Sequence, residues 1–456
     1  MIRKVFIANR GEIAVRIVRA CKAMGIDTVL GVSEADRESL GAALAGRAIC
    51  VGPPQAAKSY LNAEAIVAAA KGTGCDAIHP GYGFLSERAQ FQRMCTDAGL
   101  AFIGPSSDAI EQMGDKINAI KVARRVGVPI VPGRSSISTS AEVHVAAREL
   151  GFPLLLKASA GGGGRGMRVV QTEKDIDVAF ANARAEAMAA FGDGTLYLEK
   201  YIEKARHIEI QVLGDRFGNV VHLYERDCTV QRRHQKLIEE SPSPVLSPAV
   251  RGEMAEAALA LAREVRYTNA GTVEFVFDAD DEKFYFLEMN TRIQVEHPVT
   301  EMVTGLDIVR EQIAIADGRA LSFGHGDIRP HGCAIECRIN AEDPRRNFAP
   351  CPGRIRRWRP PVRSDVRLDT HCFEGYSVPP YYDSMLAKAI IWAPSRQEAL
   401  SGLEGYLGSF EVDGVVTTIP FQREIVTHRR FNSGEVTTTW VERELLPRMR
   451  EGGLAA

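Results

Sequence analysis

The chain has 456 residues, of which 45% are apolar and 25% are charged, a balance typical of a globular protein with about two to four domains. Its 56 basic and 58 acidic residues leave a net charge of −2, so neither nucleic acid nor an acidic membrane is expected as a partner. The sequence contains no stretch of about eighteen apolar residues, so no membrane span is expected. Nine scattered cysteines without a C-x-x-C pair favour reduced thiols in a cytoplasmic protein over disulfides or a zinc site.

Strand and helix patterns alternate over the first hundred or so residues. The predicted strands are Lys4–Ala8, Thr28–Val32, Asp76–Ile78 and Ala101–Ile103, and the predicted helices are Glu12–Met24, Asn62–Lys71 and Glu87–Ala98. This alternation predicts a parallel, doubly wound sheet. The first turn, Asn9-Arg10-Gly11-Glu12, lacks the G-x-G-x-x-G spacing, so the unit is predicted to be a scaffold rather than a nicotinamide site.

The rest of the chain divides into three patterns. A helix at Lys116–Arg125 precedes a compact unit over about 132–203, with predicted strands at Pro153–Lys157, Met167–Val170 and Thr195–Glu199 and a helix at Asp175–Phe191. From 207 to about 296, mostly antiparallel strands surround a helix at Ala249–Val265. After Pro330, short strands punctuated by proline and glycine predict a mainly β region that ends near 446.

The run Gly161-Gly-Gly-Gly-Arg-Gly166 suits a loop that folds over phosphates, because glycine lets backbone N–H groups approach oxygens closely. It is not a P-loop, since no Lys-Ser/Thr follows and the next element is a strand. A flexible hairpin explains the run equally well. Lys157, at the end of the preceding strand, favours the phosphate interpretation because it can neutralise the same group.

Two polar segments have ordinary explanations when they are considered alone. On the strand from His207, alternation places His207, Glu209 and Gln211 on one face, which indicates a surface or the wall of a polar cleft. Exposure is the favoured alternative, since sheets commonly have one wet face. The run Gln231-Arg-Arg-His-Gln-Lys236 is likewise expected to be an exposed basic loop.

Three oxygen ligands are predicted to converge at a hairpin. The predicted strands Thr272–Asp278 and Lys283–Met289 flank an acidic turn, so folding about that turn brings Glu274 opposite Glu288, and Asn290 shares the face of Glu288. Two carboxylates about 4 Å apart repel by roughly 4 kcal/mol at an effective dielectric of 20, so a cation is expected between them. Oxygen ligands suit Mg²⁺ or Mn²⁺ that bridges nucleotide phosphates. The alternative is a shifted register that leaves the acids in water.

Immediately downstream, Arg292, Gln294 and Glu296 alternate with the apolar Ile293 and Val295. An arginine, an amide and a carboxylate on one face beside a metal–phosphate centre would suit a small oxyanion substrate.

Together these runs resemble the biotin carboxylases of the ATP-grasp superfamily. The matching stretches run in family order from the first strand to about 446, and they are 79–87 (HPGYGFLSE), 157–167 (KASAGGGGRGM), 231–236 (QRRHQK), 288–298 (EMNTRIQVEHP) and 336–342 (ECRINAE). The resemblance implies a Rossmann-like N-terminal domain at 1–114. It also implies an ATP-grasp domain at 115–330 with a mobile lid at about 132–203, and a mainly β C-terminal domain at 331–446.

The resemblance also implies a role for each matching residue. ATP phosphates would be held by Lys116, Lys157, Gly162, Gly163, Gly164 and Gly166, and the adenine and the rest of the nucleotide by Glu199, Lys200, Ile202, His207, Gln231 and His234. Two Mg²⁺ or Mn²⁺ ions would be held by Glu274, Glu288 and Asn290. Bicarbonate would be held by Lys236, Arg292, Gln294 and the Val295 backbone, with Glu296 as the base, and biotin would lie near Arg338 and Tyr82.

The implied reaction is ATP-dependent carboxylation of biotin through carboxyphosphate. No Met-Lys-Met occurs and the last lysine is Lys388, so biotin is expected on a separate carrier protein, with carboxyltransferase subunits as further partners. A homodimer is expected, with Arg16 and Arg19 as candidate interface residues, although exposed arginines are also commonly only solvated. The favoured holoenzyme is acetyl-CoA carboxylase, which makes malonyl-CoA for fatty acid synthesis; a pyruvate, propionyl-CoA or other acyl-CoA carboxylase is the alternative.

Overall fold

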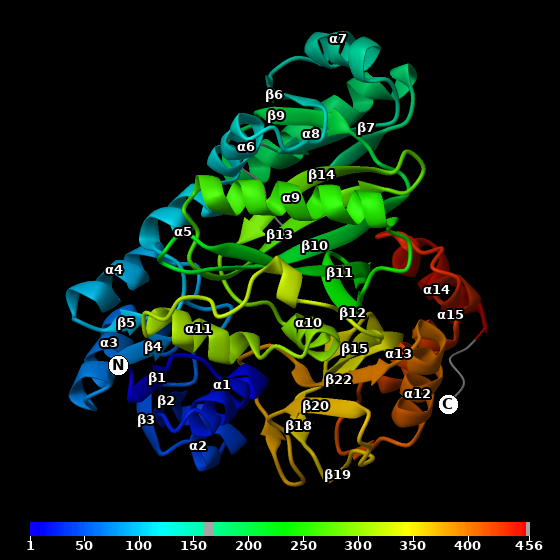
Figure 1. Ribbon diagram of the computed structural model, residues 1–456. Helices are drawn as coiled ribbons and strands as arrows, with labels where there is room; N and C mark the ends of the chain where they lie inside the picture. Colours follow the sequence, from blue (N-terminus) through cyan, green and yellow to red (C-terminus); the bar gives the residue numbers. More distant parts are fainter. Residues whose placement is uncertain (159–166, 453–456) are drawn as a thin grey trace.

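The computed structural model describes residues 1–158 and 167–452. In its N-terminal part, five parallel strands lie in the order β3-β2-β1-β4-β5 with helices packed around them (Figure 1). The strands are β1 (Lys4–Ile7), β2 (Asp27–Ser33), β3 (Arg47–Gly52), β4 (Ala77–His79) and β5 (Ala101–Phe102). The helices are α1 (Gly11–Ala23), α2 (Leu40–Leu44), α3 (Ala63–Gly72), α4 (Ala89–Asp97) and α5 (Ser107–Gly114). The predicted parallel sheet is confirmed.

A separate four-stranded antiparallel sheet stands at the top of Figure 1, beyond α6 (Lys116–Arg125). Its strands lie in the order β6-β9-β7-β8, and α7 (Ser140–Leu150) and α8 (Ile176–Phe191) pack on it. The strands are β6 (Gly133–Ile137), β7 (Leu154–Ala158), β8 (Arg168–Val170) and β9 (Leu196–Lys200). This is the unit predicted as a lid, and its predicted mobility stays a prediction.

An eight-stranded antiparallel sheet forms the centre of the molecule, in the order β14-β13-β10-β11-β12-β15-β22-β20. Its first five strands are β10 (Ala205–Gly214), β11 (Val220–Arg232), β12 (Gln235–Ser241), β13 (Asn269–Asp278) and β14 (Lys283–Asn290). The last three are β15 (Cys333–Asn340), β20 (Val366–Thr370) and β22 (Met385–Ala393). Because β12 pairs with β15, one sheet continues across the predicted boundary at residue 330, and that boundary remains a prediction.

Helices cover this sheet and bury its apolar side chains. Helix α9 (Pro248–Glu264) begins where Ser247 accepts the Val250 N–H, and it packs on β10 and β11. The short helices α10 (His297–Thr304) and α11 (Ile308–Ala316) follow β14 and pack beside β15 and α1. No helix within 1–158 or 167–452 is both long and apolar enough to cross a membrane.

The C-terminal part combines short ribbons with helices. The ribbons pair β16 (Glu342–Asp343) with β17 (Ala349–Pro350), β18 (Gly353–Arg354) with β21 (Ser377–Val378), and β19 (Arg357–Arg359) with β23 (Glu411–Asp413). The helices are α12 (Arg396–Gly408), α13 (Ile419–Thr427), α14 (Arg429–Asn432) and α15 (Leu446–Gly452). They lie on the right of Figure 1. Helix α12 packs on β15 and β22 and α13 packs on β15, which the sequence pattern did not specify.

The two arginines proposed for an interface differ in their surroundings. Arg19 is exposed, whereas Arg16 is 8% exposed and its guanidinium lies 2.9 Å from Glu301 and 2.5 Å from Asp307 of the same chain. The expectation of an exposed Arg16 is therefore wrong, because Glu301 on α10 and Asp307, which caps α11, neutralise it within the chain. Its part in a dimer interface stays a prediction.

Candidate active site

A cavity of about 870 Å³ lies between the central sheet, including its strand β15, and the N-terminal turn at 82–84. Its lining residues come from segments that are far apart in the sequence and that the fold brings together. The predicted site residues that line it are Tyr82, Lys116, His207, Gln231, His234, Lys236, Glu274, Glu288, Asn290, Arg292, Gln294, Val295, Glu296 and Arg338.

The run 231–236 is a tight β-hairpin and not the exposed loop expected from its composition. Arg233 and His234 both have positive φ, 48° and 63°, which matches the two-residue turn that suits the twist of paired strands. Gln231 and Arg232 are buried, and only the tip is exposed. The turn pairs Gln231 with Lys236 and so directs the lysine into the cavity.

Lys236 is the centre of the charged cluster. Its Nζ lies 2.6 Å from Glu209, 2.9 Å from Glu274 and 2.7 Å from Glu296. Burial alone would lower the pKa of this lysine, but Cys228 and the three carboxylates raise it well above its usual value. Lys236 therefore carries a fixed positive charge where an anion can enter.

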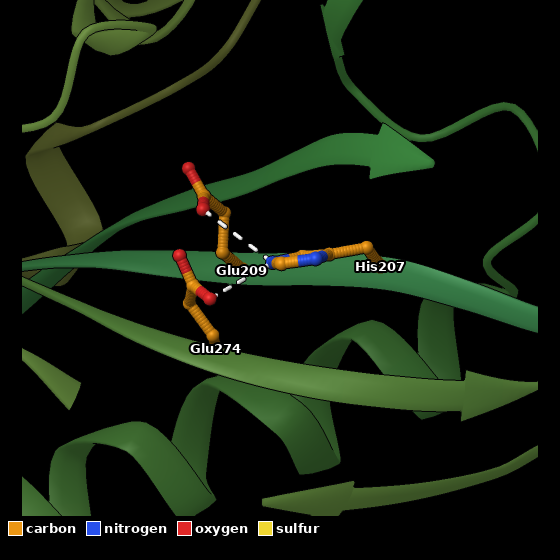
Figure 2. Close-up of side chains that lie close together, drawn as sticks. All are labelled: His207, Glu209 and Glu274. Carbon is orange, nitrogen blue, oxygen red and sulfur yellow. Dashed lines mark ion pairs between the residues drawn. The ribbon is translucent and has the colours of Figure 1, made fainter. Parts of the chain in front are cut away.

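His207 lies between two carboxylates from neighbouring strands (Figure 2). Its Nε2 is 3.1 Å from Glu274 on β13 and 4.0 Å from Glu209 on β10. Burial would raise the pKa of Glu274, yet Lys236 and His207 hold it well below its usual value. The alternation predicted for this strand is confirmed, but the expected exposure is wrong. Glu209 and Gln211 are fully buried, because the Arg226 guanidinium donates to both and Lys236 covers Glu209.

The predicted pairing of Glu274 with Glu288 is confirmed by the strand register. Lys236 and His207 already balance Glu274, whereas Glu288 has no ion pair among the described residues. Desolvation in the cavity and the adjacent Glu274 raise the pKa of Glu288, although its side chain is still exposed to solvent. Asn290 also lines the cavity, and its side-chain oxygen accepts from Arg292 at 3.0 Å. This donor set fits a hard divalent cation, because a cation would relieve the repulsion felt by Glu288.

Arg292 is fixed by contacts on several sides. Its guanidinium donates to Asn290, to Gln294 at 2.7 Å and to Glu87 at 2.8 Å. Gln294 in turn donates to Glu274 at 3.2 Å. Arg292 and Gln294 are thus held beside the acidic pair. The predicted strand alternation does not extend over this segment, because β14 ends at Asn290 and Val295 also lines the cavity.

Arg338 bridges two buried carboxylates at the other end of the cavity. Its Nε lies 2.6 Å from Glu239, and its terminal nitrogen lies 2.9 Å from Glu296. Burial raises the pKa of Glu239 to about 7 although Arg338 opposes the shift. Glu296 differs: burial would raise its pKa, but Lys236, Arg338 and Arg226 hold it well below the usual range. Glu296 is therefore ionised and flanked by two cations.

The predicted nucleotide residues outside the cavity lining cluster near β7 and β9. Lys157 forms an ion pair with Glu199, and both Lys157 and Lys116 lie within 6 Å of the Tyr197 ring centre, at 5.5 and 5.7 Å. The Lys200 amine donates to the Phe152 carbonyl at 2.7 Å, and Ile202 is half-buried in the turn after β9. Gly162, Gly163, Gly164 and Gly166 lie outside the described residues.

Comparison with known proteins accounts for this arrangement. Three family models match: the biotin carboxylase N-terminal domain at 1–110, the ATP-binding domain of the carbamoyl-phosphate synthase L chain at 115–323, and the biotin carboxylase C-terminal domain at 336–443. Biotin carboxylase 1 of Bacillus subtilis is 52% identical over 97% of this chain and 98% of its own length. The chain belongs to the biotin carboxylase family.

Two further relatives show how broad this family is. A pyruvate carboxylase subunit of Methanothermobacter thermautotrophicus is 48% identical over 97% of this chain and 90% of its own. The biotin carboxylase domain dimer of Hydrogenobacter thermophilus 2-oxoglutarate carboxylase was solved with MgADP, ADP and bicarbonate. It is 48% identical over 98% of both chains, with a TM-score of 0.89.

Family membership confirms the predicted fold class and the class of enzyme. The chain is a ligase that carboxylates biotin with ATP and bicarbonate, and the predicted use of ATP, a divalent cation and biotin is confirmed. The roles assigned to single residues remain predictions.

Three charged residues of the site received no role from the sequence. Glu239 holds Arg338, Arg226 holds Glu209, and Glu87 holds Arg292. Glu87 ends the 79–87 run, so that run contained a signal for it. Glu239 and Arg226 lie on strands that carry several other polar and charged residues, so no local signal distinguished them.

Proposed function

We propose that the chain carboxylates biotin presented by a separate carrier protein, as the carboxylase subunit of an acetyl-CoA carboxylase. The observation that supports this proposal best is Glu296, held between Lys236 and Arg338 and beside the Glu274–Glu288 pair. Purified enzyme should release ADP in a bicarbonate-dependent manner, and free biotin should stimulate that release. Soluble enzyme without biotin stimulation would contradict the proposal.

The nucleotide is proposed to lie between the central sheet and the 132–203 unit. Lys116 and Lys157 would neutralise its phosphates, together with the glycine loop. Glu199, Lys200 and Ile202 would contact the adenine, and His207, Gln231 and His234 the rest of the nucleotide. Closure of the lid over ATP would exclude water from the reaction.

Glu274, Glu288 and Asn290 are proposed to hold the divalent ions that bridge ATP phosphates. Bound there, the ions would neutralise charge that develops on the transferred phosphoryl group. The support is the unbalanced charge of Glu288 beside Glu274.

Replacing Glu288 by glutamine should raise the Mg²⁺ concentration needed for half-maximal ATP cleavage about tenfold, since one charged ligand is lost. A titration of activity with Mg²⁺, and of Mn²⁺ binding by electron paramagnetic resonance, measures the change. Glu282→Gln, on the exposed turn of the same hairpin, is the matched control. Equal Mg²⁺ requirements in the Glu288→Gln enzyme and the wild type would rule out this role.

Bicarbonate is proposed to bind where Lys236, Arg292, Gln294 and the Val295 backbone converge. An anion between Lys236 and Glu296 would draw the ammonium away from the carboxylate, so the pKa of Glu296 would rise toward that needed in a base. Glu296 would then remove the bicarbonate proton as bicarbonate oxygen attacks the γ-phosphorus of ATP. ADP leaves, and carboxyphosphate forms.

Biotin is proposed to bind against Arg338 and Tyr82. Carboxyphosphate decomposes to CO₂ and phosphate, phosphate takes the N1 proton of biotin, and the N1 anion then attacks CO₂ to form carboxybiotin. Arg338 would stabilise the resulting negative charge on the ureido oxygen by a charge-assisted hydrogen bond. The Tyr82 hydroxyl is buried without a hydrogen-bond partner among the described residues, which supports a polar ligand nearby.

Replacing Arg338 by methionine should lower biotin-stimulated turnover about a hundredfold, as loss of an oxyanion donor does. Bicarbonate-dependent ATP cleavage without biotin should fall much less, because Arg338 would act after carboxyphosphate forms. Arg345→Met, an exposed arginine that pairs with Asp343, is the control. Equal losses in both assays would contradict the division of roles between Arg338 and Glu296.

The carboxyl acceptor depends on the other components of the holoenzyme. We propose a biotin carboxyl carrier protein, a carboxyltransferase and a second copy of the chain as partners, with Arg16 and Arg19 near the dimer contact. The Methanothermobacter and Hydrogenobacter relatives support pyruvate or another 2-oxoacid as the second candidate acceptor. Co-purification of the carrier and transferase, followed by assays with each acceptor, distinguishes the two.

A further inference from the structure

The peptide carbonyls just before α10 are held by buried donors on the side away from the cavity. The Val295 oxygen lies 2.7 Å from Lys388 Nζ, and the Gln294 oxygen lies 2.7 Å from His297 Nδ1. Lys388 and His297 are both fully buried. Lys388 can reach this segment because α10 packs against β22, on which it lies (Figure 1).

Because the two carbonyls are fixed, the direction of the N–H groups in the same peptide bonds is fixed as well. The 294–295 and 295–296 peptide bonds are trans, so the C=O and N–H of each point in opposite directions. With the Gln294 and Val295 carbonyls fixed toward the interior, the Val295 and Glu296 N–H groups face the other way. That side is the cavity, which Gln294, Val295 and Glu296 line.

Neither of these N–H groups is used by the protein itself. Among the described residues, the Val295 and Glu296 amides donate to no backbone or side-chain acceptor. Two consecutive free amides beside the Lys236 ammonium form a small site with hydrogen-bond donors for an anion.

The donors behind the segment have defined states. Burial lowers the pKa of His297 far below its usual value, with help from Lys388, Arg16 and Arg367, so the ring is neutral. Its Nδ1 must carry the proton, because a carbonyl only accepts and two acceptors would repel at 2.7 Å. Its Nε2 is buried without a hydrogen-bond partner among the described residues and lies 3.9 Å from Glu301. The Gln294 carbonyl accepts the ring N–H at 2.7 Å and the His297 backbone N–H at 3.4 Å, so the side chain provides the shorter of the two bonds.

Lys388 is held by charges as well as by the carbonyl. Its Nζ lies 3.4 Å from Glu12 on α1 and 3.9 Å from Asp369 on β20. The Val295 carbonyl therefore accepts from an ammonium whose position is fixed from two other elements. A charge-assisted bond of this kind is stronger than one between neutral groups.

We propose that His297 and Lys388 are positioning residues that aim the Val295 and Glu296 amides at bicarbonate. This inference rests on the proposed function, in which bicarbonate binds at the 292–296 segment. The two side chains contact no substrate and act only through the backbone that they hold. The ligand class is a small planar oxyanion, since two adjacent amides and one ammonium can each bind an oxygen.

Two substitutions at His297 test its hydrogen bond to the Gln294 carbonyl. Asparagine and leucine have nearly the same shape, but only asparagine has an N–H donor. His297→Leu should raise the KM for bicarbonate about tenfold, because a small misplacement of binding groups is costly. The KM for ATP should stay close to that of the wild type. His297→Asn keeps an N–H donor and should restore most of the bicarbonate affinity. Lys388→Met should show the same selective rise in the bicarbonate KM as His297→Leu.

Arg396→Met is the matched control for a general loss of stability. Arg396 also donates to two carbonyls, those of Phe431 and Asn432, but far from the cavity segment. It should lower the melting temperature and leave the bicarbonate KM unchanged. Suppose that the wild-type enzyme shows biotin-stimulated turnover but folded His297→Leu or Lys388→Met has a normal KM for bicarbonate. That result would overturn this inference and leave the proposed function intact. An equal rise in the KM for ATP would overturn this inference as well.

Discussion

Replacing Glu296 by glutamine is expected to lower kcat about a thousandfold, at the middle of the range for loss of a general base. The carboxylate is buried, ionised and 2.7 Å from Lys236, where bicarbonate is proposed to enter. Glutamine keeps the size of the side chain but cannot accept the proton. The measurement is bicarbonate-dependent ADP release under saturating substrates.

Nucleotide binding distinguishes a chemical defect from a structural one in this variant. ATP affinity, measured by calorimetry, should be close to that of the wild type because Glu296 lies at the bicarbonate end of the cavity. Glu264→Gln is the control, since it removes another carboxylate that forms an ion pair, with Arg125 at 2.7 Å, away from the cavity. If Glu296→Gln retained a tenth or more of wild-type kcat, Glu296 would not be the base.

Local rules predicted the β13–β14 hairpin and the pairing of Glu274 with Glu288 correctly. The acidic turn fixed where β13 and β14 reverse, and strand alternation then placed Glu274 and Glu288 opposite each other. Both signals lie within about twenty residues, so no information from the rest of the fold was needed. The parallel N-terminal sheet was predictable for the same reason, since each strand and helix has its own pattern.

Burial of charge was not predictable from local sequence. Glu209 appeared to lie on a solvent-exposed face because its partners Arg226 and Lys236 are on other strands. The 231–236 run appeared to be an exposed loop because it is dense in basic and polar residues. Its turn residues, Arg233 and His234, are not the glycine or asparagine that would indicate a hairpin. His297 and Lys388 hold neighbouring carbonyls although they are distant in sequence. Such contacts depend on the order of strands in the central sheet, which no short motif encodes.

Replacing Arg226 by methionine is expected to lower the free energy of unfolding by about 3–5 kcal/mol, the usual effect of breaking a buried ion pair. The guanidinium is fully buried and donates to Glu209 at 2.5 Å, Gln211 at 2.7 Å, and Thr272 and Thr300 at 3.0 Å. Without it, Glu209 keeps Lys236 at 2.6 Å and the longer contact with His207 at 4.0 Å. That lysine would be drawn away from Glu296, so activity should fall as well. Denaturant titration and melting temperature measure the loss of stability.

The cause of that loss can be separated from simple removal of packing. Adding Glu209→Gln to Arg226→Met removes the unbalanced carboxylate, so the double variant should regain part of the stability if charge dominates. Arg263→Met, at an exposed pair with Glu256, should change stability by no more than about 0.5 kcal/mol. If the double variant is less stable than Arg226→Met, the loss of stability comes from lost packing and not from the unbalanced charge. In that case the Arg226–Glu209 ion pair would not be the main interaction that stabilises the pairing of β10 with β11.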